Sequence, residues 1–212
     1  MITFYNSPGT CSMVTHIALE EAGAEYRSFV INLAKGDQHD PAFLKVNPHA
    51  RVPALVTDEG TITENVAILN YLADVFGAEG SVPRGDPYKA ARCNALLSWM
   101  SGTVHAGGFA QLFRPGRFSP DDAVHEAIRE GGRAALVSHF TEIDDLCGDG
   151  WLAGEQFTAA DGYAAVFFRW ARRAQFDMSV YPRWAALVRR VVARPAVARA
   201  LEQEGLKADE FA

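Results

Sequence analysis

The spacing of hydrophobic residues changes character about a third of the way along the chain. Residues 1–76 alternate between strand-like and helix-like runs, whereas residues 88–205 show helical spacing alone. The first part predicts a small α/β layer with the order β-α-β-α-β-β-α. Its strands are expected at residues 2–5, 26–31, 54–57 and 61–63. Helices are expected at residues 12–23 and 64–76, and a short helix or turn at residues 41–46.

A segment rich in glycine and proline, residues 78–87, separates the two parts and cannot continue a helix from either side. We therefore predict two domains, residues 1–77 and residues 88–212, of which the second is entirely helical. Thr158 and Asp161 have the spacing of a capping box, which predicts a helix start. The helices of the second domain are expected at residues 88–112, 120–146, 159–174, 181–193 and 196–203.

Composition and charge narrow the classes of function. The chain has 212 residues, of which 49% are hydrophobic, so it can bury a sizeable core. Its formal net charge of −6 disfavours general affinity for nucleic acid or for anionic membranes. No apolar run reaches the length of a membrane span, and no signal peptide is visible. Three widely separated cysteines do not suggest disulfides, so we expect a soluble cytoplasmic protein.

Cys11 carries the most information about chemistry, because it lies where the first strand gives way to the first helix. The unpaired N–H groups and the dipole of a helix N-terminus favour an anion, so the pKa of this thiol is expected to fall toward roughly 6 or 7. Ser12 and Tyr5 are further donors near the thiol. Val14 stands where a dithiol motif has its second cysteine, which excludes an internal disulfide there. Cys93 and Cys147 are expected to pack as small hydrophobic residues.

Several stretches resemble the glutathione S-transferases, and most closely the bacterial beta class. They occur in the family's order and span most of the chain. In letters they are YNSPGTCS (5–12), NPHARVPAL (47–55), TENVAILNYLAD (63–74), VHAGGF with LFRP (104–109 and 112–115) and FTAAD (157–161). The resemblance implies a thioredoxin-like N-terminal domain that holds glutathione, and a helical C-terminal domain that shapes the site of a second substrate.

The resemblance also implies how glutathione, as a co-substrate, is held. Val52 and Pro53 would be joined by a cis peptide that exposes the backbone of Val52. The N–H of Asn65, where the family usually has Ser or Gly, would receive the γ-glutamyl carboxylate, and Glu64 would pair with the ammonium. The implied glutathione-binding residues are Cys11, Lys35, Arg51, Val52, Pro53, Glu64, Asn65, Ser98 and His105. Ser98 would reach the neighbouring site in a homodimer.

The implied reaction is attack of the glutathione thiolate on a small hydrophobic electrophile, with a role in detoxification. Cys11, Ser12, Tyr5 and His105 are the catalytic candidates. An imidazole with a pKa near 6.5 can accept or share the thiol proton at neutral pH, which suits His105. From their positions, the wall for the second substrate is expected to include Phe109, Phe113, Arg169 and Trp170. The histidines and cysteines lack the spacing of metal ligands, so no metal is expected.

Two other classes of function remain open at this point. Cys11 could act as a redox thiol that reduces or deglutathionylates mixed disulfides. Alternatively, the chain could be a binding module without catalysis, because this fold also occurs in regulatory proteins that have lost thiol activation.

Overall fold

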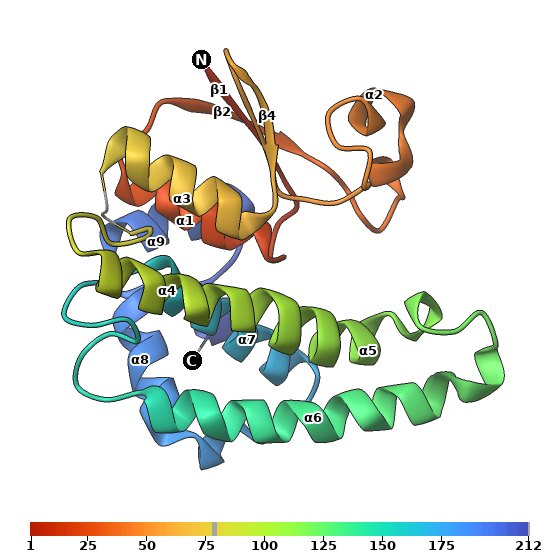
Figure 1. Ribbon diagram of the computed structural model, residues 1–212. Helices are drawn as coiled ribbons and strands as arrows, with labels where there is room; N and C mark the ends of the chain where they lie inside the picture. Colours follow the sequence, from red (N-terminus) through yellow and green to blue (C-terminus); the bar gives the residue numbers. More distant parts are fainter. Residues whose placement is uncertain (78–79, 212) are drawn as a thin grey trace.

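A four-stranded sheet forms the N-terminal half of the computed structural model, which describes residues 1–77 and 80–211. The strand order is β2-β1-β3-β4 (Figure 1), where β1 pairs parallel with β2 and antiparallel with β3, and β3 pairs antiparallel with β4. The predicted order of elements is confirmed. The strands are β1 (Ile2–Asn6), β2 (Tyr26–Val30), β3 (Ala54–Thr57) and β4 (Gly60–Thr63).

Helices α1 (Ser12–Glu21) and α3 (Asn65–Phe76) lie side by side on one face of this sheet (Figure 1). The alternation of side chains along β1 explains which residues face them. Phe4 is fully buried and its ring contacts the ring of His16 on α1. Tyr5 packs on the ring of Phe43 in α2 (Pro41–Leu44), which follows η1 (Asp37–His39). Cys11 therefore begins a helix that is fixed to the sheet by a buried face.

The C-terminal half is helical, and α7 (Ala159–Arg173) runs through its centre with nearly all of its side chains buried. The capping box of Thr158 and Asp161 is present at the start of this helix, as predicted. The other elements are α4 (Pro87–Trp99), η2 (Met100–Phe109), α5 (Ala110–Phe113), η3 (Pro115–Arg117), η4 (Asp122–Val124), α6 (His125–Leu146), η5 (Met178–Val180), α8 (Pro182–Val192), α9 (Pro195–Glu204) and η6 (Ala208–Phe211).

One hydrophobic core continues through both halves. It runs from Phe4 in the sheet to Trp184 in α8, because α1 packs against α7 and α9 as well as against α3. Cys93 and Cys147 are buried in it, as expected. The domain limits at residues 77 and 88 stay a prediction, and residues 78, 79 and 212 lie outside the described residues. Within the described part, the helices are too short or too polar to cross a membrane.

The helix predicted at residues 88–112 is interrupted by a π-helical stretch, η2, which the helical spacing did not indicate. At its end the N–H of Ala110 donates to the carbonyl of His105, five residues earlier. Such widened turns are uncommon in helices and are often found at functional sites. Here the stretch carries His105. The helix predicted at residues 120–146 also starts later, at His125, because Asp121 caps the short η4 before it.

Close packing of α5 against α6 depends on Gly132. A Cβ atom at this position would lie 2.7 Å from the Cβ of Gln111 and 3.0 Å from the carbonyl oxygen of Gly108. The oxygen belongs to the backbone and cannot move aside cheaply. At the neighbouring Gly131, a Cβ would meet only the Oε1 of Gln111, at 3.8 Å.

Gly132→Ala is therefore expected to lower the free energy of unfolding by about 1–2 kcal/mol, the cost of overpacking less the gain in helix propensity. Denaturant unfolding of the variant measures this change. Gly131→Ala is the matched control and should raise stability by up to about 1 kcal/mol, because alanine favours a helix. Equal effects of the two substitutions would contradict this role of Gly132.

Candidate active site

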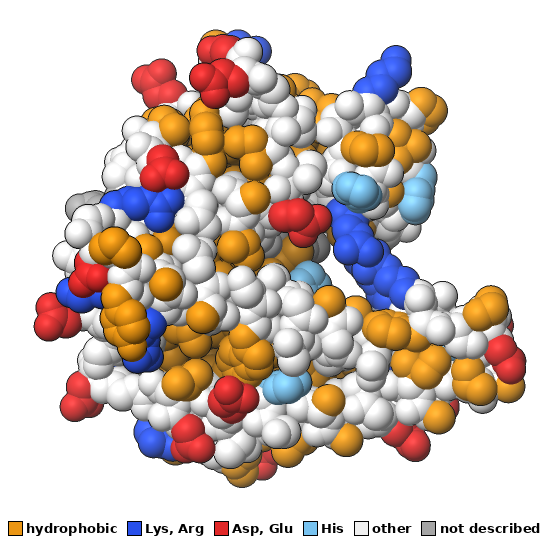
Figure 2. All heavy atoms as spheres, viewed as in Figure 1, with side chains coloured by type: hydrophobic (Ala, Val, Ile, Leu, Met, Phe, Trp, Pro, Cys, Tyr) orange, Lys and Arg blue, Asp and Glu red, His pale blue; other side chains and the backbone are white. Residues whose placement is uncertain are grey.

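A cleft of about 830 Å³ opens between the two halves of the molecule. Figure 2 shows it as a hollow that is crossed by a line of Lys and Arg side chains. One wall comes from the loop before α1 and the start of α3, and the other comes from η2, α5 and α7. Of the residues expected to bind glutathione or to catalyse, six line this cleft and belong to the N-terminal half. These six are Cys11, Arg51, Val52, Pro53, Glu64 and Asn65.

Cys11 occupies the N-cap position of α1, at the strand-to-helix junction that the sequence predicted. Its Sγ lies 3.7 Å from the carbonyl oxygen of Val52 and can donate to it. The peptide between Val52 and Pro53 is cis, which confirms that prediction. The thiol thus faces a carbonyl oxygen as well as the positive end of the helix.

The expected lowering of the Cys11 pKa is wrong. Burial raises the pKa of this thiol to about 11, and the nearby positive charge of Arg114 offsets only part of that effect. The reason is that removal from water penalises a thiolate more than the helix terminus favours it. At neutral pH, Cys11 is therefore a protonated donor.

Ser12 and Tyr5, the other two catalytic candidates of the N-terminal part, are not among the residues that line the cleft. Ser12 is fully buried, and its hydroxyl exchanges hydrogen bonds of 3.1 Å with the backbone of Ser7. Tyr5 points to the opposite side of the sheet, where its ring stacks on Phe29. Ser12 therefore stabilises the loop before α1, whereas Tyr5 packs on other aromatic rings.

The start of α3 is bound to the start of α1 through the amide of Asn65. Its Nδ2 donates to the carbonyl oxygen of Cys11 at 2.9 Å, and its Oδ1 accepts from the hydroxyl of Thr15 at 2.7 Å. Glu64 precedes it with a positive φ of 69° and is exposed at the edge of the cleft. The backbone N–H groups of two helix N-termini consequently open into one site.

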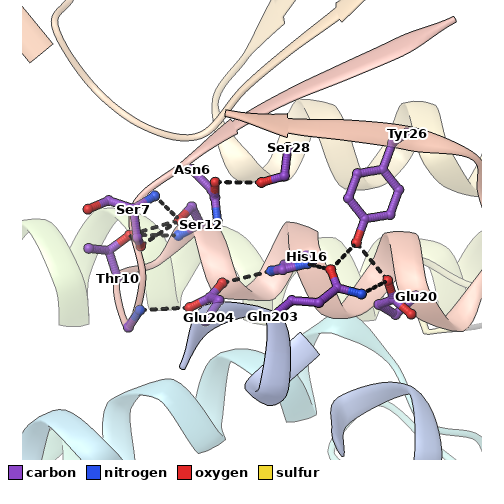
Figure 3. A network of polar contacts seen from close by, with 11 residues as sticks. Asn6, Ser7, Thr10, Ser12, His16, Glu20, Tyr26, Ser28, Gln203 and Glu204 are labelled. Carbon is purple, nitrogen blue, oxygen red and sulfur yellow. Dashed lines mark hydrogen bonds and ion pairs between the residues drawn. The ribbon is translucent and has the colours of Figure 1, made fainter. Parts of the chain in front are cut away.

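The loop before Cys11 is held from the C-terminal half. The N–H of Gly9 donates to Glu204 at 2.7 Å, and its carbonyl oxygen accepts from the Nε1 of Trp170 at 2.8 Å. The second carboxylate oxygen of Glu204 lies 2.9 Å from His16 Nδ1, within a network that continues to Gln203 (Figure 3). Sequence reasoning missed Glu204, because nothing near it in the chain indicates a distant partner.

His105 projects from η2 into the cleft, where its ring lies 4.9 Å from that of Trp170 between centroids. Burial lowers its pKa to about 4, and the positive charges of Arg114 and Arg117 act in the same direction. The expectation of an unperturbed pKa is therefore wrong, and the imidazole is neutral at neutral pH. A neutral imidazole still offers one N–H donor and one acceptor.

Two residues expected to bind glutathione lie outside the lining of the cleft. Lys35 is exposed on a loop, where its backbone N–H donates to Asn32 at 3.1 Å. Ser98 is exposed on α4. Neither side chain is brought to the site within one copy of the chain.

The residues expected to form the second-substrate wall all line the cleft, but one of them is already paired. Phe109 and Phe113 stack on each other and present their rings to Trp170. Arg169 is almost completely buried and binds Glu210 through Nη2 at 2.7 Å. Its guanidinium is therefore engaged in an ion pair within the protein and stabilises the wall of the cleft.

Arg114, Arg117 and Gln38 also line the cleft, and sequence reasoning assigned no role to them. Arg114 belongs to the LFRP stretch, so the motif itself was a signal. The Oε1 of Gln38 is buried without a hydrogen-bond partner. In the part of the chain that the structure describes, no cluster of His, Cys, Asp and Glu is arranged to hold a metal.

Comparison with known proteins places this architecture in one family. The model for the N-terminal domain of glutathione S-transferase matches residues 1–74, and the model for its C-terminal domain matches residues 126–190. Glutathione S-transferase GST-4.5 of Xanthomonas campestris is 34% identical over 203 residues, which cover 95% of this chain and 98% of that protein.

Solved structures agree over nearly the whole chain. A glutathione transferase homologue from Sulfitobacter with bound glutathione has a TM-score of 0.88 and 28% identity, and the match covers 98% of this chain and 99% of that one. The beta-class glutathione S-transferase of Sphingomonas chungbukensis has a TM-score of 0.84 and 36% identity, with coverage of 97% and 100%.

The raised pKa of Cys11 predicts slow and strongly pH-dependent alkylation. The rate with iodoacetamide, followed by peptide mass spectrometry, should rise about tenfold per pH unit between about pH 7 and pH 9 without levelling off, because the thiolate fraction grows in that proportion below the pKa. Arg114→Gln should slow the reaction at each pH, since it removes a charge that lowers the pKa. A plateau below about pH 8 would contradict the assigned pKa.

Proposed function

Because this chain belongs to the glutathione S-transferase family, we propose that its cleft binds glutathione along the N-terminal half and transfers it to a small electrophile. The chain is a glutathione S-transferase, and the comparisons do not favour a thiol reductase or a module without catalysis. We further propose that the protein is a beta-class enzyme, that it is located in the cytoplasm, and that it has a role in detoxification. The main observation in support of the proposed residue roles is that the N-termini of α1 and α3 meet beside Cys11.

Glutathione is proposed to lie from the start of α3 toward Arg51. Its γ-glutamyl carboxylate would accept from the backbone N–H of Asn65, where a helix N-terminus favours an anion. Glu64 would pair with the ammonium, and the backbone of Val52 with the cysteinyl part. Arg51 would take the glycyl carboxylate. The support is that Arg51, Val52, Glu64 and Asn65 all line the cleft and belong to the N-terminal part of the chain.

Catalysis is proposed to ionise the thiol of glutathione and not that of Cys11. A protonated Cys11 donates its S–H to the glutathione sulfur, and the neutral His105 donates its N–H from the opposite wall. Both donors favour the thiolate, which then attacks an electrophilic carbon while the leaving group departs. The raised pKa of Cys11 and the neutrality of His105 support these roles.

Two substitutions at Cys11 test this mechanism with 1-chloro-2,4-dinitrobenzene as the electrophile. Cys11→Ala should lower kcat/KM by about 10–100-fold, the loss that corresponds to one hydrogen bond to a charged group. Cys11→Ser keeps a donor and should retain most of the activity. A mechanism through a mixed disulfide at Cys11 requires that both variants be inactive, and this result would overturn the proposal.

A homodimer is proposed from the exposed apolar side chains where α3 ends and α4 begins. Val75, Phe76 and Tyr88 are 52%, 39% and 70% exposed, and Ser98 lies further along α4. Exposed apolar groups that gather on one surface often mark an interface. In such a dimer Ser98 could reach the neighbouring site.

Light scattering coupled to chromatography should give twice the mass of one chain for the wild type. Phe76→Glu should shift the protein toward a monomer, because it places a charge in the interface. Val180→Glu, at a residue 61% exposed on η5, is the control and should leave the mass unchanged. A monomeric wild type would contradict the dimer.

A further inference from the structure

Three arginine side chains meet at the mouth of the cleft without acidic partners. Arg51 precedes β3, Arg114 follows α5, and Arg117 ends η3. Within the described residues, none of the three side chains forms an ion pair or a hydrogen bond. Arg169 differs, because Glu210 neutralises it. Figure 2 shows Lys and Arg side chains that cross the hollow.

These charges act on one another and on the cleft. The pKa of Arg117 is lowered by burial and by repulsion from Arg114 and Arg51. Glu64 is the only acidic side chain among the described residues that line the cleft. An anion bound between the arginines would relieve this repulsion, and a carboxylate fits the planar donors of a guanidinium.

Bound glutathione would neutralise only part of the positive charge of these three arginines. In the proposed function its glycyl carboxylate occupies Arg51, on the N-terminal half. Arg114 and Arg117 belong to the helical half, close in sequence to the exposed ring of Phe113. Phe109 and Trp170 complete an aromatic surface with that ring. The helical wall thus combines an apolar surface with several cations, of which Arg114 and Arg117 lie near enough to repel each other.

We propose that the second substrate of this transferase is an electrophile with an aromatic body and a carboxylate, and that the carboxylate pairs with Arg114 and Arg117. The proposal rests on the proposed function and replaces the expected purely hydrophobic electrophile with an anionic one. For an aryl chloride, the sulfur–carbon bond forms, the carbon–chlorine bond breaks, and chloride leaves with the bonding electrons. The thiol proton passes to the solvent, and the carboxylate remains unchanged.

A matched pair of substrates tests the proposal: 4-chloro-3-nitrobenzoate and its methyl ester, which differ in charge. For each, kcat/KM is divided by the rate constant of its uncatalysed reaction with glutathione. The wild type should favour the acid over the ester in this normalised ratio. In the double variant Arg114→Gln/Arg117→Gln the ratio should fall at least about tenfold, mainly through a higher KM for the acid, because a charge-assisted pair is lost.

Arg189→Gln is the control, since Arg189 is exposed on α8 and lies outside the lining of the cleft. It should leave the ratio unchanged. An unchanged ratio in the double variant overturns the proposal. A rise confined to the KM for glutathione also overturns it, because both arginines would then bind the tripeptide. Turnover of the ester without preference for the acid overturns this proposal alone. Turnover of neither compound overturns the proposed function as well.

Discussion

The amide of Asn65 is the contact on which the site depends, because it joins the first turns of two helices. Strand order places α1 and α3 next to each other on the sheet, but it does not fix where their ends meet. The hydrogen bonds of Asn65 to the carbonyl of Cys11 and to Thr15 do so. A buried amide without these partners would cost more than the contacts contribute, so the arrangement is either complete or absent.

Burial decides the electrostatics of the cleft. It keeps Cys11 protonated, although a helix N-terminus favours a thiolate, and it lowers the pKa of His105 well below the ordinary value of an imidazole. A protonated thiol and a neutral imidazole can each donate a hydrogen bond into the cleft, and Arg51, Arg114 and Arg117 add positive charge to its lining. Neither Cys11 nor His105 is itself charged at neutral pH, which avoids the desolvation of a buried ion.

The parts of the structure that could be predicted depend on residues close together in the chain. The strands, the start of α1 and the capping box of Thr158 and Asp161 each have a local signal. The cis peptide before Pro53 was expected only from the resemblance to the family. The π-helical stretch, the buried position of Ser12 and the pKa values depend on packing between distant segments. Arg117 carries no motif, and its role follows only from its nearness to Arg51 and Arg114. The spacing of residues within a sequence does not indicate which distant segments come into contact in the fold.

The hydrogen bond from Gly9 to Glu204 spans 195 positions and has a consequence for biosynthesis. On the ribosome, β1 and α1 emerge long before α9 has been made. Until then the Gly9 N–H lacks its acceptor, and the turn that carries the thiol has no support from the helical half. The turn that carries Cys11 therefore reaches its final set of hydrogen bonds only after α9 has been made.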